Sequence, residues 1–566
     1  MERNMHSRSN KGIKPLALLA AALYALIVSA VVWQVHTVVT SQIYEHVPFF
    51  PAPFVAVPEP EIPFIPIPID GPTLWRNEAV SLSRFPEGLY ALYTADDQMG
   101  FFSNNFFGYS FYFPSEWEAD TRATAYYTRF FSNDFRLDIT VQDVTLAWTN
   151  PTAFQSVTLS SLEDYISSDE QKTINSHTVR IVDYDRPLID GIENDMNHYS
   201  YFFITEGNLV YVLQLKTTEE DFQSKREAIE ELLESFTLNE RQELDLTSEI
   251  LDADLSHDLI LPHENKTLSI PDGTFMMGLY TEEGITLAER EAELEVQLGL
   301  EMLYQPIDTR YDPYIGRLIE RNTISMVTFL FEESDTDENG DVVRNILNGD
   351  HDETLTDWGQ NISYLNAPVF VRLGNEMNGR WTDWSLGNNY NDPDLYKLAF
   401  VHITNVFRSA GAHNAYFVWN PNGNHAPFFA WNHAALFYPS DNVVNFVGLT
   451  HYHFGSEETS DFRALYEGLY WEYAALFYQR YMMIGEFASV ESNTDKAEWI
   501  TAAFDDIPTR FSRIKLAVWF DARHGFAVEG LNGPNLRIDT SPESLTAFRE
   551  GMSRPTVIRN LVDTEE

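Results

Sequence analysis

The sequence contains no cysteine among its 566 residues. This absence excludes disulfide bonds, thiol nucleophiles and cysteine-ligated zinc, although it does not fix the redox compartment. Basic residues are also scarce, with 37 Lys and Arg against 85 Asp and Glu and a formal net charge of −48. Because phosphate backbones and anionic lipid headgroups bind to basic surfaces, this balance argues against nucleic acid as a partner and against adsorption to an acidic membrane surface.

Apolar residues, by contrast, are abundant. Hydrophobic residues make up 44% of the chain and aromatic residues 14%, which is enough to build packed cores and excludes disorder of the whole chain. At roughly 100–200 residues per domain, the length predicts two or three domains.

One long segment near the N-terminus lacks charge. Residues 15–44 contain no Asp, Glu, Lys or Arg, and Leu16 to Val35 is almost wholly apolar. About 20 apolar residues suffice to cross a bilayer, and basic residues before such a span keep the N-terminus inside the cell. We therefore expect residues 1–45 to form a cytoplasmic stub and a transmembrane anchor, with the body of the chain extracellular. The alternative is a signal peptide cleaved after Val28-Ser-Ala30, which leaves the body secreted.

Two segments are predicted to be linkers and one to be a tail. Residues 46–74 hold nine prolines, from Pro48 to Pro72, and such a run favours an extended polyproline spacer. Residues 241–268 are acidic and irregular, and residues 557–566 follow the last periodic segment.

Residues 75–240 are predicted to form a small α/β domain. Strand-like runs recur, and Thr205-Glu-Gly-Asn208 has the turn residues of a hairpin. A helix with one apolar face is expected within Glu219–Leu238. The segment from Gly108-Tyr-Ser-Phe-Tyr-Phe-Pro-Ser-Glu-Trp117 to Leu233-Glu-Ser-Phe236 resembles the PsbP-like α/β domain. No catalytic pattern is visible here, so we expect an accessory or spacer role with unknown protein partners. The expected strands are Tyr109–Phe113, Phe135–Val141, Val179–Val182, Tyr199–Ile204 and Leu209–Leu215.

Residues 269–556 are predicted to form a (β/α)8 TIM barrel, because eight short apolar runs alternate with helical stretches. In this fold the chemistry lies at the carboxyl ends of the strands. The expected strands are Phe275–Tyr280, Leu300–Tyr304, Ser325–Phe331, Val369–Leu373, Ala415–Trp419, Phe446–Leu449, Met482–Gly485 and Leu516–Phe520.

Two glutamates follow expected strands of this barrel. Glu376 comes after the fourth strand, and Glu486 ends the seventh. Paired carboxylates at the mouth of a barrel suit glycosidic cleavage, in which one protonates the leaving oxygen and the other attacks the anomeric carbon. Mutual repulsion raises the pKa of one of them and keeps it protonated as the acid.

The stretch from Ile346 to Phe520 resembles glycoside hydrolase family 26, the endo-β-mannanase group of the retaining barrel hydrolases. The pieces that carry the resemblance are Ile346-Leu-Asn-Gly-Asp-His-Asp352, Pro368-Val-Phe-Val-Arg-Leu-Gly-Asn-Glu-Met-Asn-Gly-Arg-Trp381, Val418-Trp-Asn-Pro-Asn422, Tyr438-Pro-Ser-Asp441, Val447-Gly-Leu-Thr-His-Tyr452 and Ile484-Gly-Glu-Phe487.

The resemblance implies roles for five residues. Glu376 would be the general acid/base and Glu486 the nucleophile. Tyr452 would hydrogen-bond the nucleophile, and a buried Arg372 would orient the carboxylates and help to keep Glu486 ionised. Trp381 would shape the subsites beside the cleavage point.

Further aromatic residues have less definite roles. The resemblance implies that Trp519, at the end of the eighth strand, forms the stacking floor under the sugar. Trp384, Trp419 and Trp431 belong either to the core or to an outer subsite. His451, His453 and His524 are candidates for contacts to sugar hydroxyls rather than for a metal site.

The sequence departs from the mannanase pattern at two positions. Asn375 precedes the acid where mannanases typically carry His, and the third strand ends Phe329-Leu-Phe331-Glu-Glu instead of at a His. Asn-Glu is the commoner pair across the wider clan, in which the Asn binds the sugar 2-hydroxyl. Mixed-linkage β-glucan and bacterial exopolysaccharide therefore stand beside β-mannan as substrates.

The resulting expectation is a membrane-anchored, extracellular retaining glycoside hydrolase that cleaves a β-linked polysaccharide by double displacement. It needs no metal or organic cofactor, since two carboxylates suffice for the reaction. The alternative is a catalytically inactive, carbohydrate-binding barrel that acts as an envelope scaffold.

Overall fold

A computed structural model of the chain describes residues 88–244 and 258–563, apart from 264, 283, 335–340, 366, 456–460, 478–479, 492–494 and 524–532. The predicted anchor at residues 1–45, the proline-rich linker at 46–74 and His524 lie outside the described residues. In the part of the chain that is described, no helix has the length and apolarity needed to cross a membrane.

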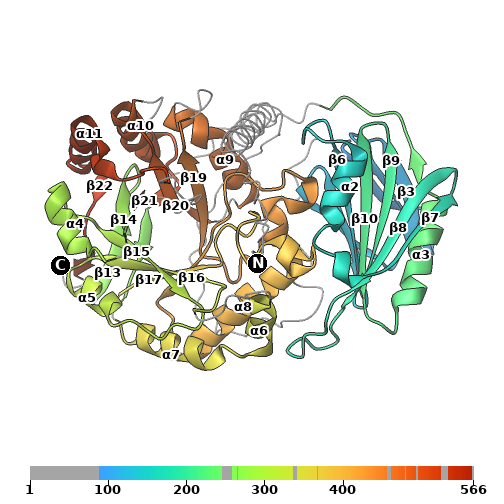
Figure 1. Cartoon of the computed structure of the whole chain (residues 1–566), viewed down its shortest axis with the longest axis horizontal. Helices are drawn as coiled ribbons and strands as arrows, with labels where there is room; N and C mark the ends of the chain where they lie inside the picture. Colours follow the sequence, from blue (N-terminus) through green and yellow to red (C-terminus); the bar gives the residue numbers. More distant parts are fainter. Residues whose placement is uncertain are drawn as a thin grey trace, which may run out of the picture.

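The C-terminal part is a closed barrel of eight parallel strands, as predicted (Figure 1). Each strand pairs with the next along the chain, and the last pairs with the first through Gly278 and Val518. All eight predicted runs are strands of the barrel, and the fourth and fifth match to the residue. The strands are β14 (Phe275–Thr281), β15 (Leu300–Pro306), β16 (Ile324–Leu330), β17 (Val369–Leu373), β18 (Ala415–Trp419), β19 (Phe446–His453), β20 (Tyr481–Ser489) and β21 (Ile514–Asp521).

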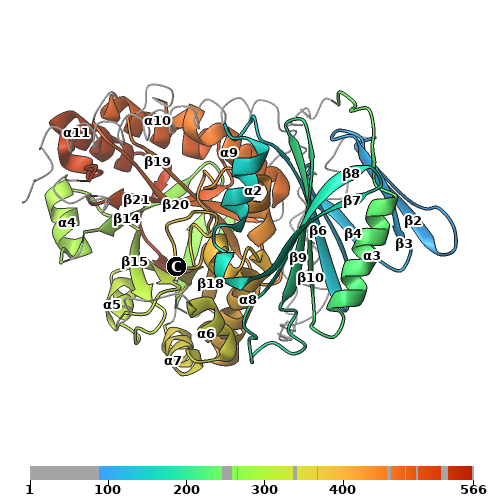
Figure 2. The same ribbon diagram turned by 45° about the vertical axis from the view of Figure 1, so that its right-hand side comes forward.

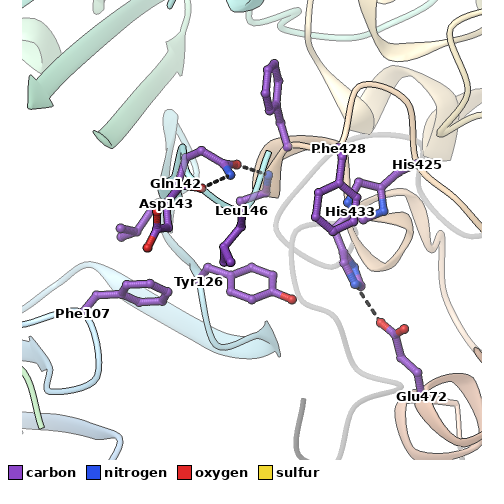
Figure 3. Close-up of a pocket in the computed structure, with 12 residues that line it drawn as sticks. Phe107, Tyr126, Gln142, Asp143, Leu146, His425, Phe428, His433 and Glu472 are labelled. Carbon is purple, nitrogen blue, oxygen red and sulfur yellow. Dashed lines mark hydrogen bonds and ion pairs between the residues drawn. The ribbon is translucent and has the colours of Figure 1, made fainter. Parts of the chain in front are cut away.

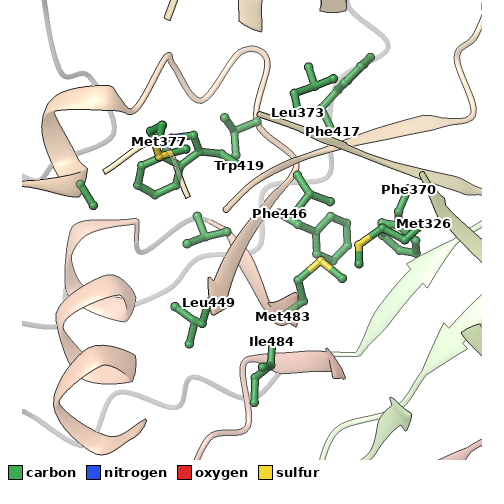
Figure 4. Packing of buried hydrophobic residues seen from close by; sticks show 14 of the residues in the cluster. Met326, Phe370, Leu373, Met377, Phe417, Trp419, Phe446, Leu449, Met483 and Ile484 are labelled. Atoms are coloured by element: carbon green, nitrogen blue, oxygen red, sulfur yellow. The ribbon is translucent and has the colours of Figure 1, made fainter. Parts of the chain in front are cut away.

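Helices surround the barrel, so the strands are buried on both faces and read as nearly continuous apolar runs. Met326, Phe370, Phe446 and Met483 come from four different strands and pack together (Figure 4). The helices are α4 (Leu287–Leu294), α5 (Tyr314–Glu320), α6 (Val342–Asn348), α7 (Asp352–Ser363), α8 (Pro393–Ser409), α9 (Phe462–Leu476), α10 (Lys496–Thr509) and α11 (Pro542–Met552).

Four short strands lie in or beside the segments expected to be a linker and a tail. β12 (Leu259–Leu261) pairs with β13 (Lys266–Ile270), and β13 pairs with β23 (Val562–Asp563). β22 (Val557–Ile558) pairs with the barrel strand β14. The described end of the acidic linker and the C-terminal residues are therefore paired with the barrel domain.

The middle part contains two antiparallel sheets and two α-helices, α2 (Pro151–Leu159) and α3 (Phe222–Glu234). The predicted hairpin is confirmed, since β9 and β10 pair from Glu206 and Leu209 outward. The resemblance to the PsbP-like domain stays a prediction. The larger sheet has the order β4 (Glu118–Thr124), β5 (Tyr127–Ser132), β6 (Phe135–Asp143), β10 (Leu209–Thr217), β9 (His198–Glu206), β8 (His177–Asp185) and β7 (Ile166–Ile174), and the smaller has the order β1 (Tyr90–Thr94), β2 (Met99–Asn104), β3 (Tyr109–Pro114) and β11 (Thr237–Leu238).

The two faces of the seven-stranded sheet pack against different partners (Figure 2). On β6, Leu137 and Ile139 point into the core that the sheet shares with α3 and the smaller sheet. The alternate residues, Arg136 and Asp138, point to the other side, toward α8 of the barrel. Alternation of apolar and charged residues along a strand commonly marks a sheet with one face in solvent. Here both faces of the sheet are buried.

Candidate active site

Two carboxyl groups lie at the carboxyl ends of barrel strands, where the sequence predicted them. Glu486 lies within β20, and Glu376 is the third residue after the end of β17. The backbone of Glu376 has a φ of 58°, an uncommon value for a residue other than glycine. Its N–H donates to the Asn420 carbonyl at 2.8 Å and so anchors this conformation to the end of the neighbouring strand.

Glu486 is held at both carboxylate oxygens. Arg372 Nη2 lies 2.5 Å from Oε1, and the two side chains are buried. The Tyr304 hydroxyl donates to the same oxygen, and the Tyr452 hydroxyl donates to Oε2. Burial and the negative charge of Glu486 raise the pKa of both tyrosines well above the ordinary value, so both remain protonated donors.

Arg372 is itself fixed from three sides. Its Nε donates to Thr328 Oγ1 at 2.8 Å, and its Nη1 donates to Asn420 Oδ1 at 3.2 Å. Burial alone would lower the pKa of Arg372, but the charge of Glu486 and contact with Tyr304 raise it, so the guanidinium stays charged. The expected buried arginine beside the second carboxylate is therefore present.

Glu376 lies in a different electrostatic environment. Burial, and secondarily the charge of Glu486, raise the pKa of Glu376 to about 7. Two donors oppose this shift: Asn422 Nδ2 lies 2.5 Å from Oε1, and Trp381 Nε1 lies 2.8 Å from Oε2. Near neutral pH the carboxyl group thus exchanges between its protonated and ionised forms, as a group that both gives and takes a proton requires.

Asn375 directly precedes Glu376 in the sequence and contacts Glu486. Its Nδ2 donates to Glu486 Oε1 at 3.4 Å, and its carbonyl accepts from Trp384 Nε1 at 2.7 Å. The Asn375 Oδ1 atom is buried and has no hydrogen-bond partner among the described residues. It is a candidate acceptor for a ligand hydroxyl.

Trp519 does not occupy the predicted position under the substrate. It is 1% exposed, donates from Nε1 to the Leu536 carbonyl and packs against Phe487 and Trp499. Successive strand residues point to opposite faces, so Trp519 on β21 points to the outer helices and Phe520 to the barrel interior. Phe520 stacks on Tyr280 of the first strand.

The other tryptophans divide between exposure and burial. Trp381 is 45% exposed beside Glu376, as a subsite aromatic should be. Trp384 and Trp419 are buried, so of the two predicted roles, core residue or outer subsite, they have the first. Trp431 donates from Nε1 to Thr158 of the middle part at 3.1 Å and therefore lies at the junction between the two parts.

Sequence reasoning missed Tyr304 and Asn422 as site residues. Both had been included in recognised segments, Tyr304 at the end of the predicted second strand and Asn422 in the Val418-Trp-Asn-Pro-Asn422 piece. Their positions at or just after the ends of predicted strands could have identified them, since polar side chains at strand ends line the mouth of a barrel.

The histidines of this region do not converge. His453 Nδ1 lies 3.0 Å from Ser489 Oγ, whereas His451 Nε2 lies 3.1 Å from Asn424 Nδ2. Within the described ranges, no group of three or more His, Asp or Glu side chains is arranged to hold a metal ion.

An open cavity with about 610 Å³ of empty space lies where the middle part meets the barrel (Figure 3). Tyr126 and Gln142 line it from one side and His425, Phe428 and His433 from the other. The Gln142 side chain accepts from the Ala430 N–H at 2.8 Å, and His433 pairs with Glu472 at 2.7 Å. The cavity belongs to the junction, while the two catalytic candidates lie at the barrel mouth.

A family model and a curated relative match parts of the chain. The model of the family described as glycosyl hydrolase family 26 matches residues 332–470, a range that includes Glu376 and ends before Glu486. Endoglucanase H of Acetivibrio thermocellus is 30% identical over 259 residues, which are 43% of this chain and 26% of that protein. The chain thus spans about a quarter of the length of this curated relative. These matches support glycoside hydrolase family 26 for the barrel part of the chain.

Solved structures of mannanases share weaker similarity. A Cellulomonas fimi endo-β-1,4-mannanase double mutant is 18% identical, covers 51% of this chain and 72% of its own, and has a TM-score of 0.38. Bacillus subtilis mannanase man26 is 16% identical, covers 44% of this chain and 80% of its own, and has a TM-score of 0.33.

Proposed function

We propose that the chain is a retaining glycoside hydrolase of family 26 type, with Glu376 as general acid/base and Glu486 as nucleophile. The observation that carries this proposal is the contrast between two neighbouring carboxyl groups. Burial raises the pKa of Glu376 to about 7, whereas Glu486 forms a buried ion pair with Arg372. One group is thus suited to donate a proton and the other to attack as an anion.

In the first step, a Glu486 carboxylate oxygen forms a bond to the anomeric carbon while the glycosidic C–O bond breaks. Protonated Glu376 gives its proton to the leaving oxygen. Tyr304, Tyr452 and Arg372 hold the attacking carboxylate in one orientation, which lowers the entropic cost of reaching the transition state.

In the second step, Glu376, now ionised, takes a proton from a water molecule. The resulting hydroxide adds to the anomeric carbon, and the ester bond to Glu486 breaks. The product keeps the anomeric configuration of the substrate, and both side chains return to their starting protonation states.

The proposed substrate is a polysaccharide of β-linked glucose or mannose. The named activity of the 30% identical relative is that of an endoglucanase. Glucose and mannose differ only in configuration at carbon 2, and the unpartnered Oδ1 of Asn375 provides an acceptor for a hydroxyl at that carbon. The exposed ring of Trp381 supplies an apolar face for a neighbouring sugar.

We further propose that residues 1–45 anchor the enzyme and leave the barrel outside the cell, where such polymers occur. This part of the proposal rests on the uncharged span after the N-terminal basic residues. Protease accessibility of the barrel in intact cells, together with membrane fractionation, tests it.

The catalytic proposal is tested on the full-length chain in detergent. Release of reducing ends from β-mannan, mixed-linkage β-glucan and β-xylan is measured for the wild type, Glu376→Ala and Glu486→Ala. Loss of activity in both variants supports the proposal. Binding of one polymer without any cleavage by the wild type would instead identify a carbohydrate-binding protein.

A further inference from the structure

The middle part of the chain contacts the segment that carries the proposed acid/base. This segment begins after β17 with Asn375 and Glu376 and ends at Asp392, the N-cap of α8. At its far end, Asp392 and Asp394 are buried against Arg136 and Arg129 of the seven-stranded sheet. The connection is therefore made by charged groups withdrawn from water rather than by exposed loops.

The ion pairs at this junction form a network. Arg136 Nη1 lies 2.7 Å from Asp392 Oδ1 and also contacts Asp394, while Arg129 Nη1 lies 3.1 Å from Asp394 Oδ1. Lys216 Nζ lies 2.6 Å from Asp392 Oδ2. Burial alone would raise the pKa of Asp392, but Lys216 and Arg136 hold it well below its usual range, so the aspartate stays charged.

Further hydrogen bonds extend the contact along the segment. Tyr199 donates to Asp392 Oδ2 at 2.8 Å. Tyr184 donates to the Tyr390 carbonyl at 3.0 Å, and Gln214 donates to the Asn391 carbonyl at 3.1 Å. Tyr390 and Asn391 have φ values of 56° and 54°, so these bonds stabilise two consecutive residues in the costly left-handed region.

Short connections lead from this junction to the backbone beside Glu376. Tyr396, in the first turn of α8, donates to the Leu373 carbonyl at 3.0 Å, and Trp384 donates to the Asn375 carbonyl at 2.7 Å. Both acceptors lie within three residues of Glu376. Displacement of the start of α8 would therefore move the backbone that positions the acid.

A second contact reaches the loop after β18, which supplies Asn422 to Glu376. The Ala430 N–H donates to Gln142 of the middle part, and Phe429 packs edge-on against Phe154 at 4.7 Å between ring centroids. Asn432 of the same loop donates to the Asn378 carbonyl at 2.8 Å and joins this loop to the segment of Glu376.

We propose that the middle part is a built-in positioning element of the active site, with Arg129, Arg136 and Tyr199 as positioning residues that fix Glu376 through the start of α8. This inference rests on the proposed function for its kinetic readout and replaces the accessory or spacer role expected from the sequence. In this proposal the polar face of the seven-stranded sheet is part of the catalytic unit, and the position of Glu376 in the barrel depends on it.

The test compares three variants of the full-length chain. Tyr199→Phe removes one hydroxyl and keeps the packing, whereas Arg136→Met removes a charge from the network. Arg226→Met is the matched control, because Arg226 forms three ion pairs within the middle part, to Glu170, Asp183 and Glu230.

Tyr199→Phe and Arg136→Met should lower kcat about tenfold to a hundredfold with KM nearly unchanged, as expected for a slightly misplaced catalytic group. Looser packing exposes Glu376 to water and lowers its pKa, so the loss of kcat/KM at high pH should begin at a lower pH. A merely destabilised protein would lose the same fraction of activity at every pH.

Amide hydrogen exchange, which needs no substrate, also tests whether the middle part positions the segment of Glu376. Amide hydrogen exchange should accelerate within residues 374–392 and 420–434 in Tyr199→Phe and Arg136→Met, but not within β20. In Arg226→Met the acceleration should stay within the middle part. Unchanged exchange in both barrel segments, or an unmoved pH profile in an active enzyme, would overturn the inference. An inactive wild type would refute the proposed function and still leave the exchange test decisive for positioning.

Discussion

Arg372 Nη2 and Glu486 Oε1 lie 2.5 Å apart, and both side chains are buried at the carboxyl ends of strands β17 and β20. The pair joins two strands that are separated by 114 positions in sequence. The guanidinium gives the buried carboxylate a charged hydrogen-bond partner in place of bulk water.

Arg372→Lys should keep the positive charge but lose the fixed set of donors to Glu486, Thr328 and Asn420. We expect kcat to fall by about a hundredfold or more, since a single preorganised donor at a reacting charge contributes that much. The check is steady-state kinetics together with circular dichroism. A variant that folds as the wild type does and keeps full kcat would contradict the assigned role.

Glu376→Gln should abolish cleavage but stabilise the fold in alkaline buffer. The folded-state pKa of about 7 lies above the unfolded value, so ionisation of Glu376 costs folding free energy as the pH rises from about 4 to 7. The cost at pH 8 is on the order of 3 kcal/mol. Thermal unfolding at pH 4 and pH 8 measures it: the difference between variant and wild type should be small at pH 4 and in favour of the variant at pH 8. Equal differences at both pH values would show that the pKa is not raised.

Trp381→Phe should move the pH profile rather than abolish activity. The substitution keeps an aromatic face for the sugar but removes the donor to Glu376 Oε2, which favours the ionised form. The pKa of Glu376 should rise, and the decline of kcat/KM should shift to higher pH. A shift to lower pH would mean that the hydrogen bond has the opposite effect.

Trp519 and Phe520 should respond differently to truncation. Trp519→Leu leaves a cavity in the packing against Phe487 and Trp499 and should cost about 2–4 kcal/mol of stability with little change in KM. Phe520→Ala acts on a side chain that stacks on Tyr280 inside the barrel and should raise KM. The pair is compared by chemical denaturation and by KM. The reverse pattern would restore Trp519 as the floor of the site.

Much of the barrel was readable from the sequence because its strands are short apolar runs at regular spacing. Val369–Leu373 and Ala415–Trp419 were predicted to the residue. In the middle part, strand β7 was missed. Its sequence, Ile-Ser-Ser-Asp-Glu-Gln-Lys-Thr-Ile, alternates in burial but carries few apolar side chains. Its pairing with β8 decides its conformation, and no local pattern reports that contact.

The site was predictable where one residue type at a strand end defines the chemistry, as for Glu376 and Glu486. It was not predictable where the phase of a strand decides which side chain faces inward. Trp519 was predicted to lie under the sugar, but it is buried outside the barrel, and Phe520 faces the interior. The buried role of Arg136 was hidden for a related reason. Its alternation with apolar neighbours is the same for a face covered by water and for a face covered by another domain.

The stereochemistry of azide rescue tests the central claim most directly. An aryl β-glycoside with a good leaving group is supplied to Glu376→Ala and Glu486→Ala in the presence of azide, and the glycosyl azides are identified by NMR. Without the acid/base, azide attacks the intermediate on Glu486 and the product is the β-azide; without the nucleophile, azide attacks the substrate directly and the product is the α-azide. The account predicts this opposite pair, and the same anomer from both variants would contradict it.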